Sequence, residues 1–439
     1  MLLFLFTKTP LVFFIQSFWR DEAFSYFLAK KNIVEIISLT AKDFNPPLYY
    51  LLLHFWVRIF GGSEIALRSL SLIFYWATIY VVFLFLNKVF KFDLKKSFLY
   101  LILVAVNPLL VYYAFEARMY TMFAFSSTLS FYLFYQKKFL PYLVISILGL
   151  YTHYFMIFVI LAQLVFILLT VKKGKIIPLK YLVISMIVFL PWLTFILITK
   201  PLNQSFWIEK PPLAAVFNFL GIIFFGYEAS AYIPNVELLR KIVFFTNLVL
   251  VFALINGIVF IKTRLKKSET SLVVYLIIWS LVLPILIGII SFFRPIYLSR
   301  YLIFSSVGFL IFIIFILDKL KPKLRVPIII ALLSLTYFYQ KEQIISHRKT
   351  DLKKTIKEIK LMAKKNDKLY VTSELDFMTA QYYFSENQVY IFEKTYEEIP
   401  DYVGKILISP NEITNRLPIY PNKAFILNSD GSYEIKAIY

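Results

Sequence analysis

The sequence predicts an α-helical polytopic membrane protein of about 11 spans plus interfacial helices, followed by a small C-terminal α/β domain. Of its 439 residues, 60% are hydrophobic and only 17% are charged, whereas charged residues make up about a quarter of an ordinary soluble domain. Apolar stretches of about 20 residues, enough for a helix to cross a bilayer, recur along the chain. Lysine and arginine gather in the short segments between these stretches, as they do in cytoplasmic loops.

The predicted spans run from the N-terminus to residue 338. They are 1–17, 64–87, 97–115, 119–136, 139–152, 154–171, 181–199, 240–262, 270–291, 300–318 and 324–338. Lys8 and Pro10 shorten the apolar run of the first span, so either Lys8 snorkels to the interface or the natural protein begins upstream of Met1. The apolar segments 46–60 and 213–226 are too short to cross a bilayer, and we expect interfacial or re-entrant helices there, on the outer side.

Alternation of these spans places all the basic loops on one face. The loops contain Lys88, Lys91, Lys95 and Lys96; Lys137 and Lys138; Lys172, Lys173, Lys175 and Lys180; Lys262, Arg264, Lys266 and Lys267; and Lys319, Lys321, Lys323 and Arg325. An excess of lysine and arginine marks cytoplasmic loops, so this face is predicted to be cytoplasmic. The opposite, external face receives Asp21, Asp43, Glu116, His153, Arg294 and Arg300. We therefore expect a multi-pass plasma-membrane protein whose functional groups and C-terminal domain are extracytoplasmic.

The net charge and the cysteine content exclude two classes of function. The formal charge of +21 would suit a nucleic-acid-binding protein, but the basic residues lie mostly in the short loops, where they set topology. We therefore expect no nucleic-acid partner. The chain has no cysteine, which excludes disulfides and cysteine-ligated metal sites.

The two predicted domains are 1–338, which contains the spans, and 339–439, which is polar and basic. Apolar residues at helical spacing between Leu352 and Met362 predict a helix, and short apolar runs predict strands at 369–371, 389–392, 406–408 and 424–427. No glycine-rich phosphate loop or metal signature occurs in this second domain, so no chemistry is predicted for it.

The charged stretch 18–60 stands out between apolar segments. The adjacent acids Asp21 and Glu22 follow the aromatic pair Phe18 and Trp19, where the first span should reach the membrane surface. Ionised carboxylates near hydrocarbon are costly and usually face a cavity or an interface. A solvated loop that ends where Pro46 starts a helix is the alternative interpretation. The second acid, Asp43, just ahead of the proline pair favours a functional site.

This stretch resembles the first external loop of GT-C membrane glycosyltransferases, in particular the protein O-mannosyltransferase and aminoarabinose transferase group. The matching motifs occur in the expected order and cover most of 19–301. They are Trp19-Arg20-Asp21-Glu22-Ala23, Asp43-Phe44-Asn45-Pro46-Pro47-Leu48-Tyr49-Tyr50, Gly62-Ser63-Glu64 with Arg68, Asn107-Pro108, Glu116-Ala117-Arg118-Met119-Tyr120, Tyr151-Thr152-His153-Tyr154 and Ser299-Arg300-Tyr301. The resemblance implies a GT-C fold, a polyprenyl-phosphate-linked sugar donor, and a lipid, glycan or protein acceptor.

The resemblance also implies roles for individual residues. Asp21 fills the position of the acceptor-activating carboxylate, and Glu22, one residue on, is expected to support the site or bind acceptor. Arginine offers bidentate geometry to a phosphate, so Arg300, beside Tyr301, is the first candidate for the donor phosphate. The remaining substrate-binding candidates are Asp43, Glu116, Arg118, His153 and Arg294. For Arg118 and Arg294 an anchoring role at the interface is an equal alternative.

The sequence leaves open whether the protein uses a metal ion. Asp43, Glu116 and His153 are candidate ligands for a divalent metal, since some members of the wider fold use one and the mannosyltransferase branch does not. Asn45 stands where the aminoarabinose transferase branch has a charged residue, which argues against that branch's substrate or metal site.

The predicted span 139–152 is about 21 Å long at 1.5 Å per residue, so His153 is expected below the outer surface, either facing a cavity or satisfied at a helix junction.

Three functions are compatible with this pattern. The first is an inverting glycosyltransferase for lipid or protein glycosylation at the outer leaflet. The second is a flippase for lipid-linked sugars, which would favour charges near the middle of the membrane and paired broken helices. The third is a non-catalytic scaffold for the C-terminal domain, which would not need the acids of the first loop. Because the charges concentrate on one face, the sequence favours the transferase.

Overall fold

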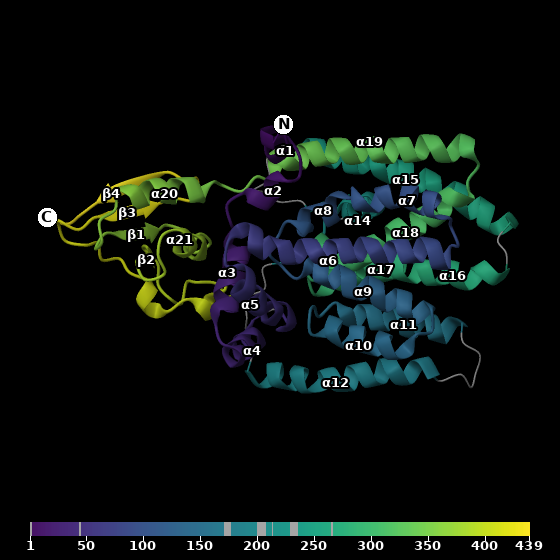
Figure 1. Ribbon diagram of the computed structural model, residues 1–439, viewed down its shortest axis with the longest axis horizontal. Coiled ribbons are helices and arrows are strands. Elements are labelled where there is room, and N and C mark those ends of the chain that lie inside the picture. The colour runs from purple at the N-terminus through teal and green to yellow at the C-terminus, as the bar shows by residue number, and fades with distance from the viewer. Residues whose placement is uncertain are drawn as a thin grey trace.

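The computed structural model describes residues 2–43, 45–170, 177–199, 208–212, 214–228, 236–264 and 267–439. Its helices form an elongated bundle, and a small domain containing a β-sheet extends from one end of that bundle (Figure 1). We call this the domain end. The opposite end, where segments 90–93, 136–138 and 320–321 reverse the chain, is called the loop end.

The described residues contain six helices that are long and apolar enough to cross a membrane. They are α6 with its π-helical turn (Glu64–Val89), α12 (Ile177–Thr199), Glu237–Val259 of α15 (Val236–Arg264), α16 to α17 (Glu269–Phe293), η3 (Ser299–Leu302) with α18 (Ile303–Lys319), and α19 (Pro322–Ser346). Helices α7 (Leu94–Ala105) and α8 (Pro108–Ala114) meet at 72°, and this bent pair is either a broken seventh span or a re-entrant loop. Asn107 caps α8 and Pro108 occupies its first turn, so a new helix begins there. The chain is therefore a multi-pass membrane protein.

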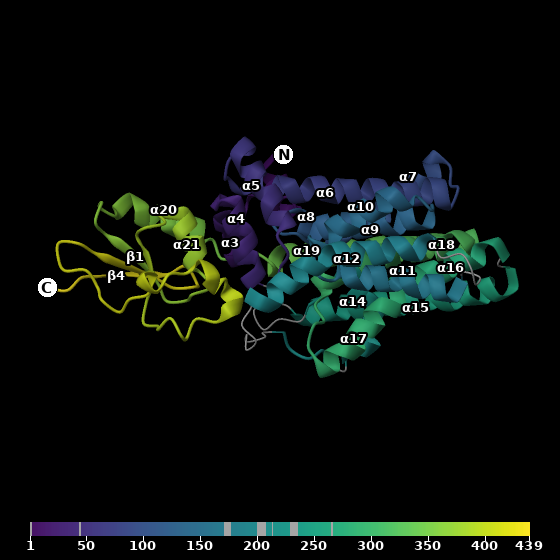
Figure 2. The ribbon, with the colours of Figure 1, turned by 90° about the horizontal axis from the view of Figure 1, so that it is seen from below.

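Three other predicted spans form shorter helices, α9 (Tyr120–Tyr135), α10 (Phe139–Leu150) and α11 (Met156–Thr170). They run alongside the long helices (Figure 2). Helix α18 is the centre of the bundle, because all of its residues from Ile303 to Leu317 are buried. The predicted short helices within 213–226 are α13 (Ala214–Phe217) and α14 (Phe219–Phe225), while residue 213 lies outside the described residues.

The prediction of a span over 1–17 is wrong. This segment forms two short helices, α1 (Leu2–Lys8) and α2 (Val12–Ile15), with a break at Thr9 and Pro10. Pro10 has no backbone N–H to continue the helix, and the Thr9 hydroxyl donates to the carbonyl of Leu5. The break thus follows from the proline that made the predicted span short.

The loops 90–93, 136–138 and 320–321, which belong to the predicted basic loops, lie together at the loop end. At the loop end Asp318 pairs with Lys96 at 2.6 Å and with Arg325 at 3.6 Å, and Lys319 pairs with Glu269 at 2.5 Å. These pairs join the loop-end termini of α7, α16, α18 and α19. Of the predicted basic residues, Lys172, Lys173, Lys175 and Lys266 lie outside the described residues.

Three helices lie between the bundle and the C-terminal domain: α3 (Arg20–Lys30), α4 (Ile33–Lys42) and α5 (Leu48–Phe60) (Figure 1). A capping box between Asn32 and Glu35 starts α4 immediately after α3 ends. Pro47 precedes α5, consistent with the helix start predicted at the proline pair. The charged stretch 18–60 therefore forms a helical layer over the domain end of the bundle.

The C-terminal sheet has the strand order β2-β1-β3-β4. Strands β1 (Lys368–Val371), β2 (Val389–Ile391) and β3 (Ala424–Leu427) confirm three predicted strands, and β4 (Tyr433–Lys436) was not predicted. Helices α20 (Leu352–Met362) and α21 (Phe377–Tyr383) accompany the sheet. The fourth predicted strand, 406–408, is wrong, because that segment belongs to a 3₁₀ turn, η5 (Lys405–Leu407), packed against α3. Helix α19 also continues to Ser346, beyond its predicted end at 338.

Candidate active site

A cavity of about 50 Å³ opens at the domain end of the bundle. Segments that are far apart in the sequence meet there: the first turns of α3, the link between α4 and α5, the start of α9, the turn η3, and a loop of the C-terminal domain. Its lining residues are Arg20, Asp21, Phe24, Asp43, Asn45, Arg118, Tyr120, Arg300, Tyr301, Tyr402, Val403 and Gly404. The cavity thus contains both acids and arginines, with aromatic walls.

Asp21 faces this cavity from the first turn of α3. Its carboxylate accepts a hydrogen bond of 2.9 Å from Arg20 Nε, and its side chain is 16% exposed. Burial alone would raise the pKa of Asp21, but the guanidinium groups of Arg20, Arg118 and Arg300 hold this pKa well below its usual range. Asp21 is therefore ionised at neutral pH and surrounded by positive charge.

Glu22 points away from the cavity, because consecutive helical residues are about 100° apart around the axis. Its carboxylate receives two hydrogen bonds of 2.7 Å from Arg68, one of 2.8 Å from Lys349 Nζ and one of 3.0 Å from the backbone N–H of Ala117. Arg68 also donates to the backbone carbonyls of Phe14, Gln16 and Ser17. Glu22 therefore lies in a buried network that joins α3 to four other segments.

Two arginines line the cavity on its bundle side. Arg118, which precedes α9, donates from Nη1 to Tyr50 Oη at 3.2 Å and to the carbonyl of Asp21 at 3.4 Å, and its Nε is buried without a hydrogen-bond partner. Arg300 lies in η3, where its backbone N–H donates to Glu228 Oε1 at 3.0 Å and its Nη1 is 3.6 Å from Glu228 Oε2. Glu228 therefore fixes the turn that brings Arg300 to the cavity.

Besides Glu22, three predicted site residues do not line the cavity. Glu116 is buried beside it; burial raises its pKa to about 7, although the nearby Lys349 opposes the shift. His153 is stacked on Phe123 with ring centroids 4.6 Å apart, and its Nδ1 accepts the backbone N–H of Phe155, which matches a histidine satisfied at a helix junction. Arg294 ends α17 and is exposed. Asp21, Asp43, Arg118, Arg300 and Tyr301 are the predicted residues that the cavity brings together.

The metal candidates do not form a coordination site. Among the described residues there is no group of three or more histidine, aspartate or glutamate side chains that could hold a metal ion. Asp43 lines the cavity, whereas the carboxylate of Glu116 and the imidazole of His153 lie outside its lining. Burial also lowers the pKa of His153 to about 3, so its ring is neutral and stacked rather than directed at Asp43. These residues therefore do not fit a shared metal site.

Sequence interpretation missed several residues around the cavity. Arg20 and Tyr120 belong to the recognised motifs, and their position beside Asp21 and Arg118 was the available signal. Glu228 and Lys349 lie in no motif, and neither do the cavity residues Tyr402, Val403 and Gly404. Only the folded chain brings these five residues to the site.

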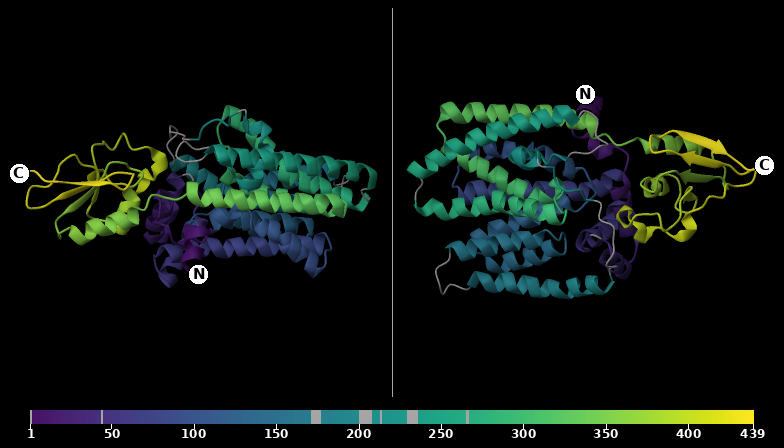
Figure 3. Two further views of the ribbon diagram at one scale, coloured as in Figure 1. Left: turned by 90° about the horizontal axis from the view of Figure 1, so that it is seen from above. Right: turned by 180° about the vertical axis from the view of Figure 1, so that it is seen from behind.

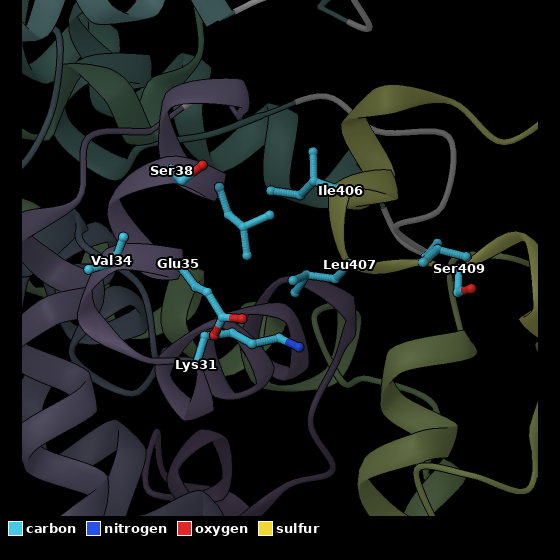
Figure 4. A pocket seen from close by; sticks show the side chains of 9 residues that line it. Lys31, Val34, Glu35, Ser38, Ile406, Leu407 and Ser409 are labelled. Atoms are coloured by element: carbon cyan, nitrogen blue, oxygen red, sulfur yellow. The ribbon is translucent and has the colours of Figure 1, made fainter.

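A larger depression, of about 470 Å³, lies between α4 and the segment 406–409 (Figure 4). Its lining includes Lys31 and Glu35 among mainly aliphatic and serine side chains. Glu35 accepts the backbone N–H of Asn32 at 3.1 Å as part of the capping box. The depression thus contains a single acid that is already engaged in a helix cap, so the smaller, charged cavity is the candidate active site.

No family model and no curated protein matches the sequence. Solved structures share its fold, among them two of ArnT. ArnT from Cupriavidus metallidurans in the apo state matches with a TM-score of 0.65 and 11% identity, over 95% of this chain and 91% of ArnT. ArnT bound to undecaprenyl phosphate matches with a TM-score of 0.60 and 12% identity over the same shares. The chain therefore has an ArnT-like GT-C fold, which confirms the fold that the motifs predicted.

Proposed function

From the ArnT-like fold and its charged cavity, we propose that this protein is a membrane glycosyltransferase. It moves a sugar from a polyprenyl-phosphate-linked donor to a hydroxyl of a lipid, glycan or protein acceptor. The observation that carries this proposal is the ionised Asp21 in a cavity with Arg118 and Arg300. The ArnT structure with undecaprenyl phosphate supports a polyprenyl phosphate as the lipid.

In this reaction Asp21 accepts the proton of the acceptor hydroxyl, and the hydroxyl oxygen attacks the anomeric carbon of the donor sugar. The bond between that carbon and the phosphate oxygen breaks, and the polyprenyl phosphate leaves with the electron pair. Attack opposite the leaving group inverts the anomeric configuration. Arg300 and Arg118 stabilise the phosphate, and charge stabilisation in a water-poor site contributes strongly to catalysis. A bound phosphate also neutralises the cations that lower the pKa of Asp21, which makes Asp21 a stronger base.

One feature expected of a flippase, charge in the middle of the membrane, is absent from the central helix of the bundle. Charged groups at the middle of the membrane would be expected of a transporter for a charged lipid. The buried centre of the bundle, residues 303–317 of α18, contains no charged residue. The charged cavity lies instead at the domain end, and the basic loops at the other end favour an extracytoplasmic location for it.

Donor consumption by the purified protein tests this proposal. Detergent-solubilised parent protein and Asp21→Asn are each incubated with synthetic undecaprenyl-phosphate sugars and membrane extracts as the acceptor source. We expect the parent to release undecaprenyl phosphate from at least one donor, and Asp21→Asn to release it at least about a hundredfold more slowly. If the parent consumes no donor but moves lipid-linked sugar across liposomes, the protein is a flippase.

A further inference from the structure

The C-terminal domain contributes part of the cavity wall. Tyr402 and Val403 lie in the turn η4 (Asp401–Val403), and together with Gly404 they line the cavity that contains Asp21. The sequence predicts no chemistry for this domain. The domain lies next to α3 at the domain end, as the views from above and from behind in Figure 3 show.

Several polar contacts hold the domain against the bundle. Tyr382 Oη donates to the carbonyl of Gly62 at 2.7 Å, and Tyr383 Oη accepts the backbone N–H of Phe18 at 2.8 Å. Lys353 pairs with Glu64 at 2.6 Å. The rings of Phe18 and Tyr382 also pack with their centroids 4.7 Å apart. Because these contacts surround the start of α3, they fix the domain beside Asp21.

The loop that carries Tyr402 packs directly on α3. Gly404 has φ +85°, a conformation that favours glycine, and a Cβ at this position would lie 2.6 Å from Phe24 Cδ2 and 2.9 Å from Met378 Cε. This close approach needs glycine. It places the Tyr402 ring with its centroid 5.9 Å from the Arg20 guanidinium carbon, and Arg20 in turn bonds Asp21.

The cavity therefore has two different sides. The bundle side carries Arg118, Tyr120, Arg300 and Tyr301, at the ends of membrane-embedded segments, and the opposite side carries Tyr402 and its neighbours. A polyprenyl phosphate is anchored in the bilayer by its hydrocarbon chain, so it reaches the cavity from the bundle side. The acceptor hydroxyl must approach Asp21 from the remaining side.

We propose that segment 401–404 of the C-terminal domain is the acceptor-facing wall of the transfer site, with Tyr402 as a residue that determines acceptor specificity. This inference rests on the proposed glycosyltransferase function. Tyrosine suits the role because its rigid ring supplies a large contact area at a low entropy cost, and its hydroxyl can form hydrogen bonds. The domain thus completes the site instead of being an independent appendage.

The absence of cysteine from the sequence allows a direct test. Tyr402→Cys is modified with N-ethylmaleimide, and Tyr439→Cys, in which the replaced residue is 97% exposed at the end of the same domain, is the matched control. Two quantities are compared before and after modification: acceptor-dependent release of undecaprenyl phosphate from the donor, and binding of undecaprenyl phosphate alone.

Modification at position 402 is expected to slow transfer by at least about tenfold, since an added group on this wall obstructs the acceptor. Binding of undecaprenyl phosphate should stay within about twofold, and the control should change in neither assay. In Tyr402→Ala, the acceptor KM should rise by about tenfold with little change in kcat, as expected when a contact made equally in ground and transition states is lost.

Two results would overturn the inference while leaving the proposed function intact. One is full modification of Tyr402→Cys with unchanged transfer. The other is a loss of undecaprenyl phosphate binding as large as the loss of transfer, which would put Tyr402 on the donor side. A parent protein that releases no undecaprenyl phosphate from any donor overturns the proposed function, and the inference falls with it.

Discussion

Arg68 and Glu22 form a bidentate pair with two hydrogen bonds of 2.7 Å, and neither side chain has any exposed surface. Because of this pair, the adjacent acids Asp21 and Glu22 have different roles. Glu22 is fully engaged by Arg68, Lys349 and the backbone N–H of Ala117, whereas Asp21 faces the cavity. The acid expected to act on substrate is therefore Asp21, and Glu22 is expected to maintain the position of α3.

Glu22→Gln should destabilise the protein, because the charges of Arg68 and Lys349 then remain buried without the carboxylate that neutralises them. Removal of one partner of a buried ion pair typically costs about 3–5 kcal/mol. Thermal unfolding in detergent should show a lower Tm for this variant. Adding Lys349→Met removes one of the two uncompensated cations, so the double variant should regain part of the loss. An unchanged Tm in Glu22→Gln would contradict the role of the network.

Asp21→Asn should keep the fold and lose transfer. The carboxylate and amide have similar shapes, but the amide cannot accept a proton, and loss of a general base costs about a hundredfold or more. Sugar transfer and binding of undecaprenyl phosphate are measured on the same preparation. Glu397→Gln, at an exposed acid of the C-terminal domain, is the control. Turnover at the parental rate in Asp21→Asn would exclude Asp21 as the base.

Arg300→Lys should weaken the binding of undecaprenyl phosphate by about tenfold or more, although the charge is conserved, because lysine cannot reproduce the bidentate geometry. Arg294→Lys is the matched control, since Arg294 is exposed and outside the cavity lining. Binding titrations of both variants at equal protein concentration check this. If Arg300→Lys binds as the parent does, the phosphate is held elsewhere, and Arg118 is the remaining cavity arginine from the bundle side.

Glu116 should make stability fall as pH rises. Its pKa in the folded protein is raised to about 7 from an ordinary value of 4.5. Between these two pH values Glu116 is therefore protonated in the folded state and ionised in the unfolded state. Stability therefore decreases with rising pH across that window. Glu116→Gln removes this effect. The difference in Tm, variant minus parent, should therefore be larger at pH 8 than at pH 5. A Tm difference independent of pH would contradict the raised pKa.

The orientation of the two ends can be tested with single cysteines in the cysteine-free chain. Lys95→Cys lies near the start of α7 at the loop end, and Tyr439→Cys lies in the C-terminal domain. Positive residues at the loop end predict that it is cytoplasmic. In intact cells a membrane-impermeant maleimide should label position 439 and leave position 95 unlabelled until the cells are opened. Labelling of both positions in intact cells would contradict the predicted topology.

Much of the bundle could be predicted from the sequence, because an apolar helix of sufficient length is a local property. The long helices α12, α18 and α19 all overlap predicted spans. Errors arose where one residue or a tertiary contact decided the outcome. Pro10 broke the first predicted span. The apolar run 406–408 formed a 3₁₀ turn on α3 instead of joining the sheet.

For the site, the sequence alone predicted that its acids and arginines gather at one end of the bundle, since hydrophobic length and loop charge predict how the chain alternates across the membrane. The motifs also indicated Asp21 and Arg300. Only the tertiary structure decided that Glu22 pairs with Arg68, that His153 is stacked on Phe123, and that Tyr402 reaches the cavity. These are contacts between residues distant in sequence. They depend on how the helices and the C-terminal domain pack, which no local pattern specifies.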